Sequence, residues 1–308
     1  MVCVYKHNSR AYFTVGPFYF FIMNELLKLA VQKSGRLYEG SVRLLKECGI
    51  EINNGNNQLR VRAAEFPLEV FFLRDDDIPE YVQDAVADIG FVGENVVKEK
   101  NKQVDIIAQL GFGKCRLSLA APKNGVINKL DDLQHKKIAT SYPYVLNDYL
   151  QKNNISAEIH EISGSVEIAP RIGLADAICD LVSSGSTLFT NELKEIETLF
   201  ESQAVLISNK DLSSDKKEIL QKLLFRINAV KKAKNNKYVL LNAPNDKLEI
   251  ICSLIPGMKS PTILPLADKN WSSVHSVINE NDFWNVIETL KMNGAQGILI
   301  VPIEKMVV

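Results

Sequence analysis

Hydroxyl, glycine and acidic residues follow one another near the middle of the chain in an order that suits phosphate chemistry. The apolar run 177–182, interrupted only by Asp180, predicts a buried strand, and residues 183–187 after it predict a flexible, hydroxylated loop that leads into a helix. Such a loop directs backbone N–H groups and hydroxyls at one point, where a phosphate monoester can bind without a lysine. Asp176 and Asp180 flank the strand, and their carboxylates suit the hydroxyls of a sugar. The stretch therefore predicts a site for a phosphorylated ribose.

The same stretch resembles the signature of ATP phosphoribosyltransferase, the enzyme that opens histidine biosynthesis. Ten residues fall at the spacing of that signature: Glu167, Gly173, Ala175, Ile178, Asp180, Leu181, Ser184, Gly185, Thr187 and Leu188. The resemblance extends from Met23 to the end of the chain, through family-like blocks at 32–37, 74–79, 115–118, 139–143 and 302–305. It implies transfer of the 5-phosphoribosyl group from 5-phosphoribosyl 1-pyrophosphate (PRPP) to N1 of the adenine ring of ATP, with release of pyrophosphate.

The resemblance and the loop chemistry together give the expected PRPP site. Its expected residues are Glu167, Asp176, Ser183, Ser184, Gly185, Ser186 and Thr187. Asp176 and Asp180 are the catalytic candidates, because their carboxylates would accept from the ribose hydroxyls and stabilise the positive charge that develops on the sugar. Mg²⁺ is expected to be held mainly by the substrate pyrophosphate, so no protein ligand is assigned to it. Taken without the signature, Asp180 could equally cap a helix or pair with a lysine.

ATP carries a triphosphate, which requires fixed cations at the ends of strands, where ligands collect in α/β sheets. The candidates for binding ATP, or AMP as a competing inhibitor, are Lys33, Arg36, Arg74, Arg116 and Tyr142. An alternative interpretation makes Lys33 and Arg36 ordinary surface charges. Residues 74–77 could likewise be a solvated charge cluster in which Asp77 begins a helix.

Alternating strand and helix patterns predict an α/β fold with two lobes like those of periplasmic binding proteins, followed by a ferredoxin-like βαββαβ module. Predicted strands include 27–31, 68–73, 137–140, 155–162 and 177–182, and predicted helices include 38–48, 78–87, 192–200 and 212–232. In the last module, Asp282 is expected to cap a helix over 283–292.

The expected domains are an extension at 1–22, disordered or a mis-assigned start, a first lobe at 23–115 plus 205–225, a second lobe with the PRPP loop at 116–204, and a terminal domain at 226–308. The resemblance implies that this terminal domain resembles ACT regulatory modules and binds histidine as a feedback inhibitor, at residues that stay unassigned. It also implies a homo-oligomer that changes from dimer to hexamer.

Composition limits the remaining classes. A net charge of -1 excludes binding to nucleic acid or anionic membranes through bulk electrostatics. The five cysteines are scattered, without the spacing of a disulfide framework or a zinc site, which predicts reduced thiols and a cytoplasmic protein. Two other interpretations stay open: a two-lobed small-molecule binding protein, and a catalytically silent regulatory subunit.

Overall fold

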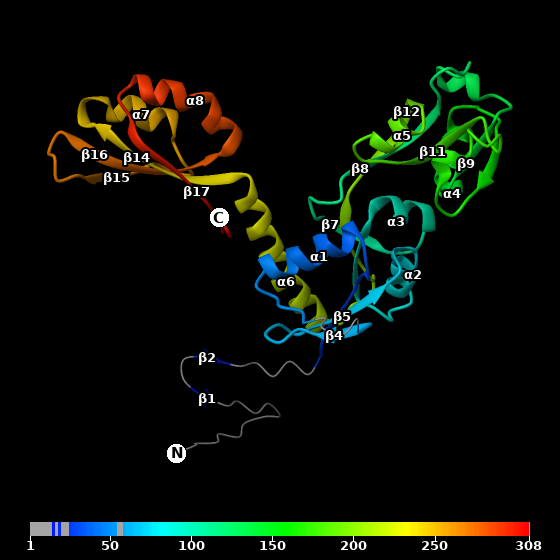
Figure 1. The fold of residues 1–308 in the computed structure, drawn as a ribbon. Coiled ribbons are helices and arrows are strands. Elements are labelled where there is room, and N and C mark those ends of the chain that lie inside the picture. Colours follow the sequence, from blue (N-terminus) through cyan, green and yellow to red (C-terminus); the bar gives the residue numbers. More distant parts are fainter. Residues whose placement is uncertain (1–13, 16–17, 20–24, 54–57, 308) are drawn as a thin grey trace. The chain divides into compact units, whose positions relative to one another are not determined.

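A computed structural model describes residues 14–15, 18–19, 25–53 and 58–307, and the chain forms two compact units (Figure 1). One unit comprises Met1–Val42 with Ile50–Leu220, and the other comprises Arg43–Gly49 with Gln221–Val308. The expected extension at 1–22 lies outside the described residues except for two short antiparallel strands, β1 (Thr14–Val15) and β2 (Phe18–Tyr19).

The first sheet of the larger unit, which we call lobe I, has the strand order β4-β5-β3-β6-β13-β7. Its strands are β3 (Leu27–Gln32), β4 (Arg60–Arg62), β5 (Leu68–Leu73), β6 (Ile89–Gly93), β7 (Asp105–Gln109) and β13 (Ala204–Ser208). Its helices are α1 (Arg36–Glu47), the 3₁₀ turn η1 (Asp75–Asp77), α2 (Ile78–Gln83) and α3 (Glu94–Lys100). Strand β3 runs parallel to β5 and β6, so the segments that follow β3 and β5 emerge at one edge of the sheet.

The second sheet, lobe II, has the strand order β10-β9-β11-β8-β12. Its strands are β8 (Cys115–Pro122), β9 (Lys137–Thr140), β10 (Glu158–Glu161), β11 (Ala177–Val182) and β12 (Leu193–Ser202). Helices α4 (Pro143–Lys152) and α5 (Ser186–Thr190) and the 3₁₀ turns η2 (Leu130–Leu133) and η3 (Val166–Ile168) accompany it. The chain passes from β7 in lobe I to β8 in lobe II and returns from β12 to β13. This double connection confirms the predicted two-lobed α/β arrangement.

The smaller unit holds most of α6 (Ser214–Lys234) and an antiparallel sheet with the order β15-β16-β14-β17. Its strands are β14 (Asn236–Pro244), β15 (Thr262–Pro265), β16 (Trp271–Asn279) and β17 (Gln296–Pro302). Helices α7 (Leu248–Leu254), preceded by η4 (Asn245–Lys247), and α8 (Glu280–Met292) lie against one face of this sheet (Figure 1). Leu241 of β14, Ile251 of α7 and Phe283 of α8 belong to the buried cluster between helices and sheet. The predicted ferredoxin-like module is therefore confirmed.

Two local predictions were wrong. Residues 192–200 were expected to form a helix, but all of them except Glu192, which lies in a turn, belong to strand β12. Two register shifts in its pairing with β8, at Glu195/Glu197 and Thr198/Phe200, interrupt the alternation of a regular strand and produce a spacing that resembles a helix. Helix α8 begins earlier than predicted, because the side chain of Asn279, not Asp282, caps it by accepting from the amide of Asn281 at 3.0 Å.

None of the helices in the described part of the chain combines the length and hydrophobicity needed to cross a membrane. The four described cysteines, Cys48, Cys115, Cys179 and Cys252, are free thiols. Cys48 and Cys179 are buried, and burial raises the pKa of the Cys48 thiol to about 11.

Candidate active site

The hydroxylated loop lies where β11 ends, at the start of the short helix α5. Gly185 has a φ of +79°, a left-handed conformation that favours glycine and lets the chain turn. The hydroxyls of Ser184 and Ser186 lie 2.9 Å apart, and both side chains are exposed together with Ser183 and Thr187. The first amides of α5 have no acceptor within the helix. The loop thus offers clustered hydroxyls and amides to an oxygen-rich ligand.

The two candidate catalytic acids occupy different places along β11: Asp176 directly precedes the strand, and Asp180 lies within it. Asp180 is near the loop, and burial raises its pKa, with a further contribution from the nearby charge of Glu167 in η3. Asp176 precedes the strand, and its Oδ2 accepts from the amide of Lys137 at 2.9 Å. Four residues along a strand span roughly 13 Å. Glu167 and Asp180 thus lie in two segments that contact each other, η3 and β11, whereas Asp176 is tied to the start of β9.

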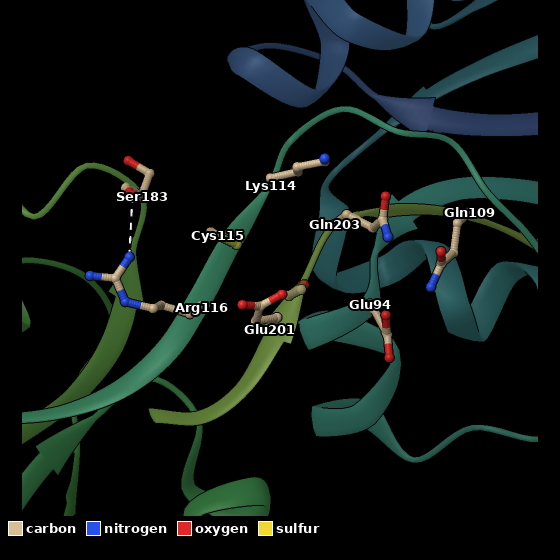
Figure 2. Close-up of a pocket in the computed structure, with 9 residues that line it drawn as sticks. Glu94, Gln109, Lys114, Cys115, Arg116, Ser183, Glu201 and Gln203 are labelled. Carbon is tan, nitrogen blue, oxygen red and sulfur yellow. Dashed lines mark hydrogen bonds between the residues drawn. The ribbon is translucent and has the colours of Figure 1, made fainter. Parts of the chain in front are cut away.

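A cavity of about 400 Å³ lies beside the loop, where the chain passes between the two lobes (Figure 2). Its lining includes two cations and two acids together with Ser183: Glu94, Lys114, Arg116, Ser183 and Glu201. Arg36 of lobe I donates from Nη1 to the hydroxyl of Ser183 at 3.3 Å, and Nη1 of Arg116 lies 3.5 Å from the carbonyl of Ser183. Ser183 at the start of the loop therefore contacts Arg36 and Arg116, two of the three predicted arginines.

Arg116 is held by an acid that the sequence did not reveal. Its Nε and Nη2 atoms donate to the two carboxylate oxygens of Glu195 at 2.5 and 2.6 Å. The hydroxyls of Ser118 and Thr198 also donate to this carboxylate, at 2.7 and 3.1 Å. These contacts, the arginine first, lower the pKa of Glu195 to about 2, so the pair is fully charged at neutral pH.

Tyr142 lies at the start of α4 and is fixed by a hydrogen bond from lobe I. Nδ2 of Asn95 donates to the Tyr142 hydroxyl at 3.0 Å, and Asn95 is itself bonded to the buried Ser202. Burial raises the pKa of Tyr142 well above its usual range, and the nearby charges of Asp180 and Asp75 add to the shift. The Asn95 hydrogen bond therefore links the start of α4 in lobe II to lobe I.

Lys33 and Arg74 lie side by side at the edge of the lobe I sheet. They directly follow the parallel strands β3 and β5, and the amide of Lys33 donates to the carbonyl of Leu73 at 2.8 Å. Both side chains are exposed, and neither lines the cavity beside the loop. Asp77 does precede α2, but its side chain makes no capping hydrogen bond, so the alternative role suggested for it is not seen.

Comparison with known proteins relates most of the chain to one enzyme family. Residues 74–229 match the family described as ATP phosphoribosyltransferase, and residues 233–305 match the family described as HisG, C-terminal domain. An ATP phosphoribosyltransferase from Cytophaga hutchinsonii is 58% identical over 285 residues, which cover 92% of this chain and all of that protein. The chain belongs to the ATP phosphoribosyltransferase family. A second member, from Bacteroides thetaiotaomicron, is 56% identical over 283 residues, with the same two coverages.

A solved family member supports the assignment of the catalytic part. The chain resembles the ATP phosphoribosyl transferase (HisG:HisZ) complex from Thermotoga maritima with a TM-score of 0.57 and 29% identity. The match covers 99% of that chain but only 66% of this one. Because this chain also carries the HisG, C-terminal domain at 233–305, it is a long-form ATP phosphoribosyltransferase, a phosphoribosyltransferase of the first step of histidine biosynthesis.

Several residues around the family's signature loop could not be picked from the sequence. Glu94, Asn95 and Lys114 come from lobe I or from the segment that connects the lobes, and no motif marks them. Glu195 lies in the strand that was expected to be helical, where an acid is an unremarkable surface residue. One local signal for Glu195 did exist: Glu195 and Glu197 alternate with Ile196, as residues of a strand do. The register shifts of β12 interrupt this alternation, so the strand was not recognised.

Proposed function

We propose that this protein transfers the 5-phosphoribosyl group of PRPP to N1 of the adenine ring of ATP and releases pyrophosphate. The observation that carries the proposal is the hydroxylated loop after β11, with Asp180 and Glu167 at its base and two arginines at its rim. In this arrangement Ser183, Ser184, Gly185, Ser186 and Thr187 hold the 5-phosphate of the ribose. The phosphate thereby fixes the position of the anomeric carbon.

The acids near the loop suit the charge that develops during the reaction. When the bond between ribose and pyrophosphate breaks, positive charge builds on the sugar and negative charge on the leaving group. The carboxylates of Asp180 and Glu167 accept from the ribose hydroxyls and stabilise the sugar cation. Asp176 is left out of the proposed site because it lies at the far end of β11. Most of the rate enhancement would come from holding adenine N1 in line with the anomeric carbon.

ATP, or AMP as a competing inhibitor, is held by cations at the sheet edges. Arg36 and Arg116 are the better-supported members of the predicted set, since both contact Ser183 of the loop. Lys33 and Arg74 share the edge of the lobe I sheet and would bind the more distant phosphates. Tyr142, held in place by Asn95, would line the adenine side of the site.

Mg²⁺ fits this site as a partner of the substrates. Glu94 and Glu201 line the cavity and would repel a bare pyrophosphate, whereas a pyrophosphate that carries Mg²⁺ suits mixed lining charges. Within the described residues no three His, Cys, Asp or Glu side chains come together as a metal site. Mg²⁺, held mainly by the pyrophosphate, would supply charge stabilisation of the leaving group.

The C-terminal module at 226–308 would serve regulation, with residues 23–115 plus 205–225 and 116–204 as the two catalytic lobes. In this proposal histidine binds the terminal domain and inhibits the enzyme, which forms homo-oligomers that change from dimer to hexamer. We further propose that the enzyme works in the cytoplasm. The match of 233–305 to the HisG, C-terminal domain supports the separate role of this module.

The test is pyrophosphate release measured with PRPP, ATP and Mg²⁺, and with each of the three omitted in turn. Release should require all three. Asp180→Asn and Thr187→Val should each lower kcat/KM by about a hundredfold or more, as expected for lost transition-state contacts. Asp176→Asn is the matched control on the same strand, and its folded protein should keep kcat/KM within about threefold. Release by Asp180→Asn and Thr187→Val at the wild-type rate would refute the assignment of the site, and pyrophosphate release without ATP would refute the reaction.

A further inference from the structure

Arg116 forms a bidentate ion pair with Glu195, a more defined geometry than that of an ordinary surface ion pair. Its Nε and Nη2 groups donate to separate oxygens of Glu195 at 2.5 and 2.6 Å, in the parallel arrangement that fixes the plane of a guanidinium. The side chains of Arg116 and Glu195 are 33% and 28% exposed, so both lie partly within the fold. A flexible arginine at this place would otherwise sample many rotamers.

Glu195 is anchored from its own side. Ser118, which is 1% exposed, donates to Oε1 at 2.7 Å, and Thr198 donates to the same oxygen at 3.1 Å. Strand β12 pairs with β8, which carries both Ser118 and Arg116, and Glu195 is opposite Ala120 in this pairing. The acid is therefore held by two hydroxyls in addition to the arginine, which a solvated surface carboxylate would not be.

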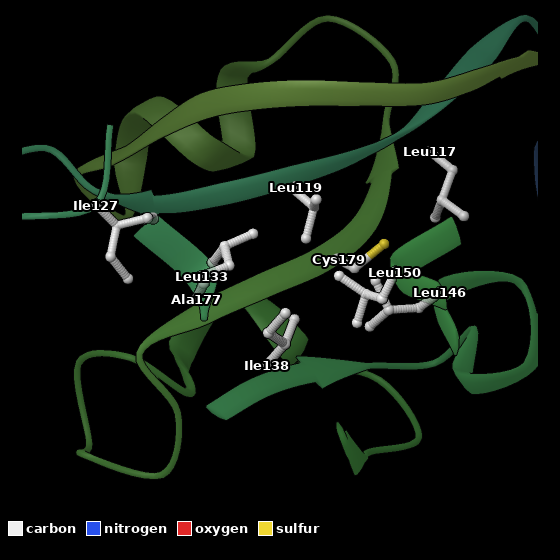
Figure 3. Packing of buried hydrophobic residues seen from close by; sticks show 10 residues of the cluster. Leu117, Leu119, Ile127, Leu133, Ile138, Leu146, Leu150, Ala177 and Cys179 are labelled. Atoms are coloured by element: carbon white, nitrogen blue, oxygen red, sulfur yellow. The ribbon is translucent and has the colours of Figure 1, made fainter. Parts of the chain in front are cut away.

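The strands that carry these residues cannot shift easily. Leu117 and Leu119 of β8 and Cys179 of β11 form one buried cluster together with Leu146 and Leu150 of α4 (Figure 3). In the β8–β11 pairing, Arg116 is opposite Val182, the residue just before the loop. The buried cluster thus fixes the position of the Arg116 backbone relative to the phosphate-binding loop.

We propose that Glu195 is a positioning residue, which holds Arg116 so that the remaining guanidinium N–H groups face the phosphate oxygens of a substrate beside the loop. A guanidinium has five N–H donors, and Glu195 takes two of them. Nη1 points toward Ser183 (Figure 2), and Arg116 is one of the residues that line the cavity. The proposal rests on the proposed function and deepens it, because it explains how one arginine is aimed at the phosphates.

The test compares wild type with Glu195→Gln, Arg116→Ala, the double variant and Glu195→Asp. Glu197→Gln is the matched control, since Glu197 has the same charge on the same strand but does not line the cavity. Two quantities are measured: kcat and KM for PRPP and ATP, and the affinity for inorganic pyrophosphate with Mg²⁺ by calorimetry. Circular dichroism and the melting temperature establish that each variant is folded.

Glu195→Gln should raise the KM of one of the two phosphate substrates, and lower kcat/KM for it, by about tenfold or more. Its affinity for pyrophosphate should fall by a similar factor, while Glu195→Asp recovers part of both losses and Glu197→Gln stays within about twofold. In the Arg116→Ala background, Glu195→Gln should add less than about a twofold loss, because the two residues act through one contact. If Glu195→Gln does not fold, Ser118→Ala, which removes one donor to the carboxylate, should lower pyrophosphate affinity in the same direction.

Three outcomes overturn the proposal: unchanged pyrophosphate affinity in folded Glu195→Gln, losses that multiply with those of Arg116→Ala, or a lower melting temperature without any change in KM or affinity. A wild-type protein that binds pyrophosphate but releases none from PRPP and ATP would instead count against the proposed function. The binding measurements would still decide the role of Glu195 in that case.

Discussion

Helix α4 of lobe II is capped by a side chain from lobe I, and removal of that side chain should loosen the start of the helix. Tyr142, the residue at the N-cap position, makes no side-chain capping bond. The carboxylate of Glu99, in α3, instead accepts from the amides of Tyr144 and Val145 at 2.9 and 3.0 Å. These amides belong to the first turn, whose N–H groups have no acceptor within the helix. Glu99→Ala leaves both without their partner.

The expected magnitude follows from the two roles of this carboxylate. Loss of a capping acceptor costs about 1 kcal/mol, and loss of a negative charge at a helix N-terminus costs about 0.3–1 kcal/mol more. The sum, about 2 kcal/mol, corresponds to about 30-fold in an opening equilibrium. Glu99→Gln keeps one acceptor oxygen and loses the charge, so about 1 kcal/mol and about fivefold are expected.

Hydrogen exchange of the amides at Tyr144 and Val145 measures this equilibrium directly, because both amides are bonded to Glu99 in the folded protein. Their exchange should be about 30-fold faster in Glu99→Ala than in wild type. Glu80→Ala is the control, since Glu80 forms an exposed pair with Lys102 at 3.1 Å and its loss should change exchange by less than about twofold. Equal exchange rates in Glu99→Ala and Glu80→Ala would refute the capping role.

Three further predictions concern stability and thiol access. Asp88→Asn should lower the free energy of unfolding in urea by about 3 kcal/mol, because it breaks the pair of a 4% exposed carboxylate with Lys216 at 2.8 Å; a loss below about 1 kcal/mol would contradict this. Iodoacetamide should modify Cys115 faster than the buried Cys48. PRPP should protect only Cys115, because Cys115 lines the cavity. Mass spectrometry of the labelled protein measures both the relative rates and the protection. The pKa of Glu195 lies at about 2, below the ordinary 4.5, so its stabilisation is complete above pH 4.5 and lost as the pH falls toward 2; the difference in unfolding free energy between wild type and Glu195→Gln should shrink over that range and stay constant at neutral pH.

The sequence predicted best those elements whose pattern is purely local. The strands expected at 68–73, 137–140 and 177–182 are found with these bounds, because each is a short apolar run between polar residues. The loop at 183–187 was equally visible, since glycine and small hydroxylated residues mark turns irrespective of the tertiary fold. Strand β12 was misread because its register shifts hide the alternation that identifies strands.

Contacts between segments that are distant in the chain could not be predicted from the sequence. Asp176 and Asp180 are four positions apart and looked like one acidic pair, yet the extended strand separates them, and Asp176 is bonded to the start of β9. The contact of Glu99 with α4 joins residues 45 and 46 positions apart, from different lobes. One local signal did exist: a helix that starts with Tyr142-Pro143 lacks a capping side chain, so it requires an acceptor from elsewhere.

The charges around the loop favour fixed donors over surplus positive charge as the means of binding phosphate. Lys114 and Arg116 line the same cavity as Glu94 and Glu201, and Arg116 also has its own acid in Glu195. A strongly basic cavity would attract both polyanionic substrates of the proposed reaction but would not distinguish their phosphates. Hydroxyls, amides and an oriented guanidinium instead define a position and a direction for each oxygen. Because the proposed transfer depends on alignment of adenine N1 with the anomeric carbon, such a site serves catalysis better than attraction alone.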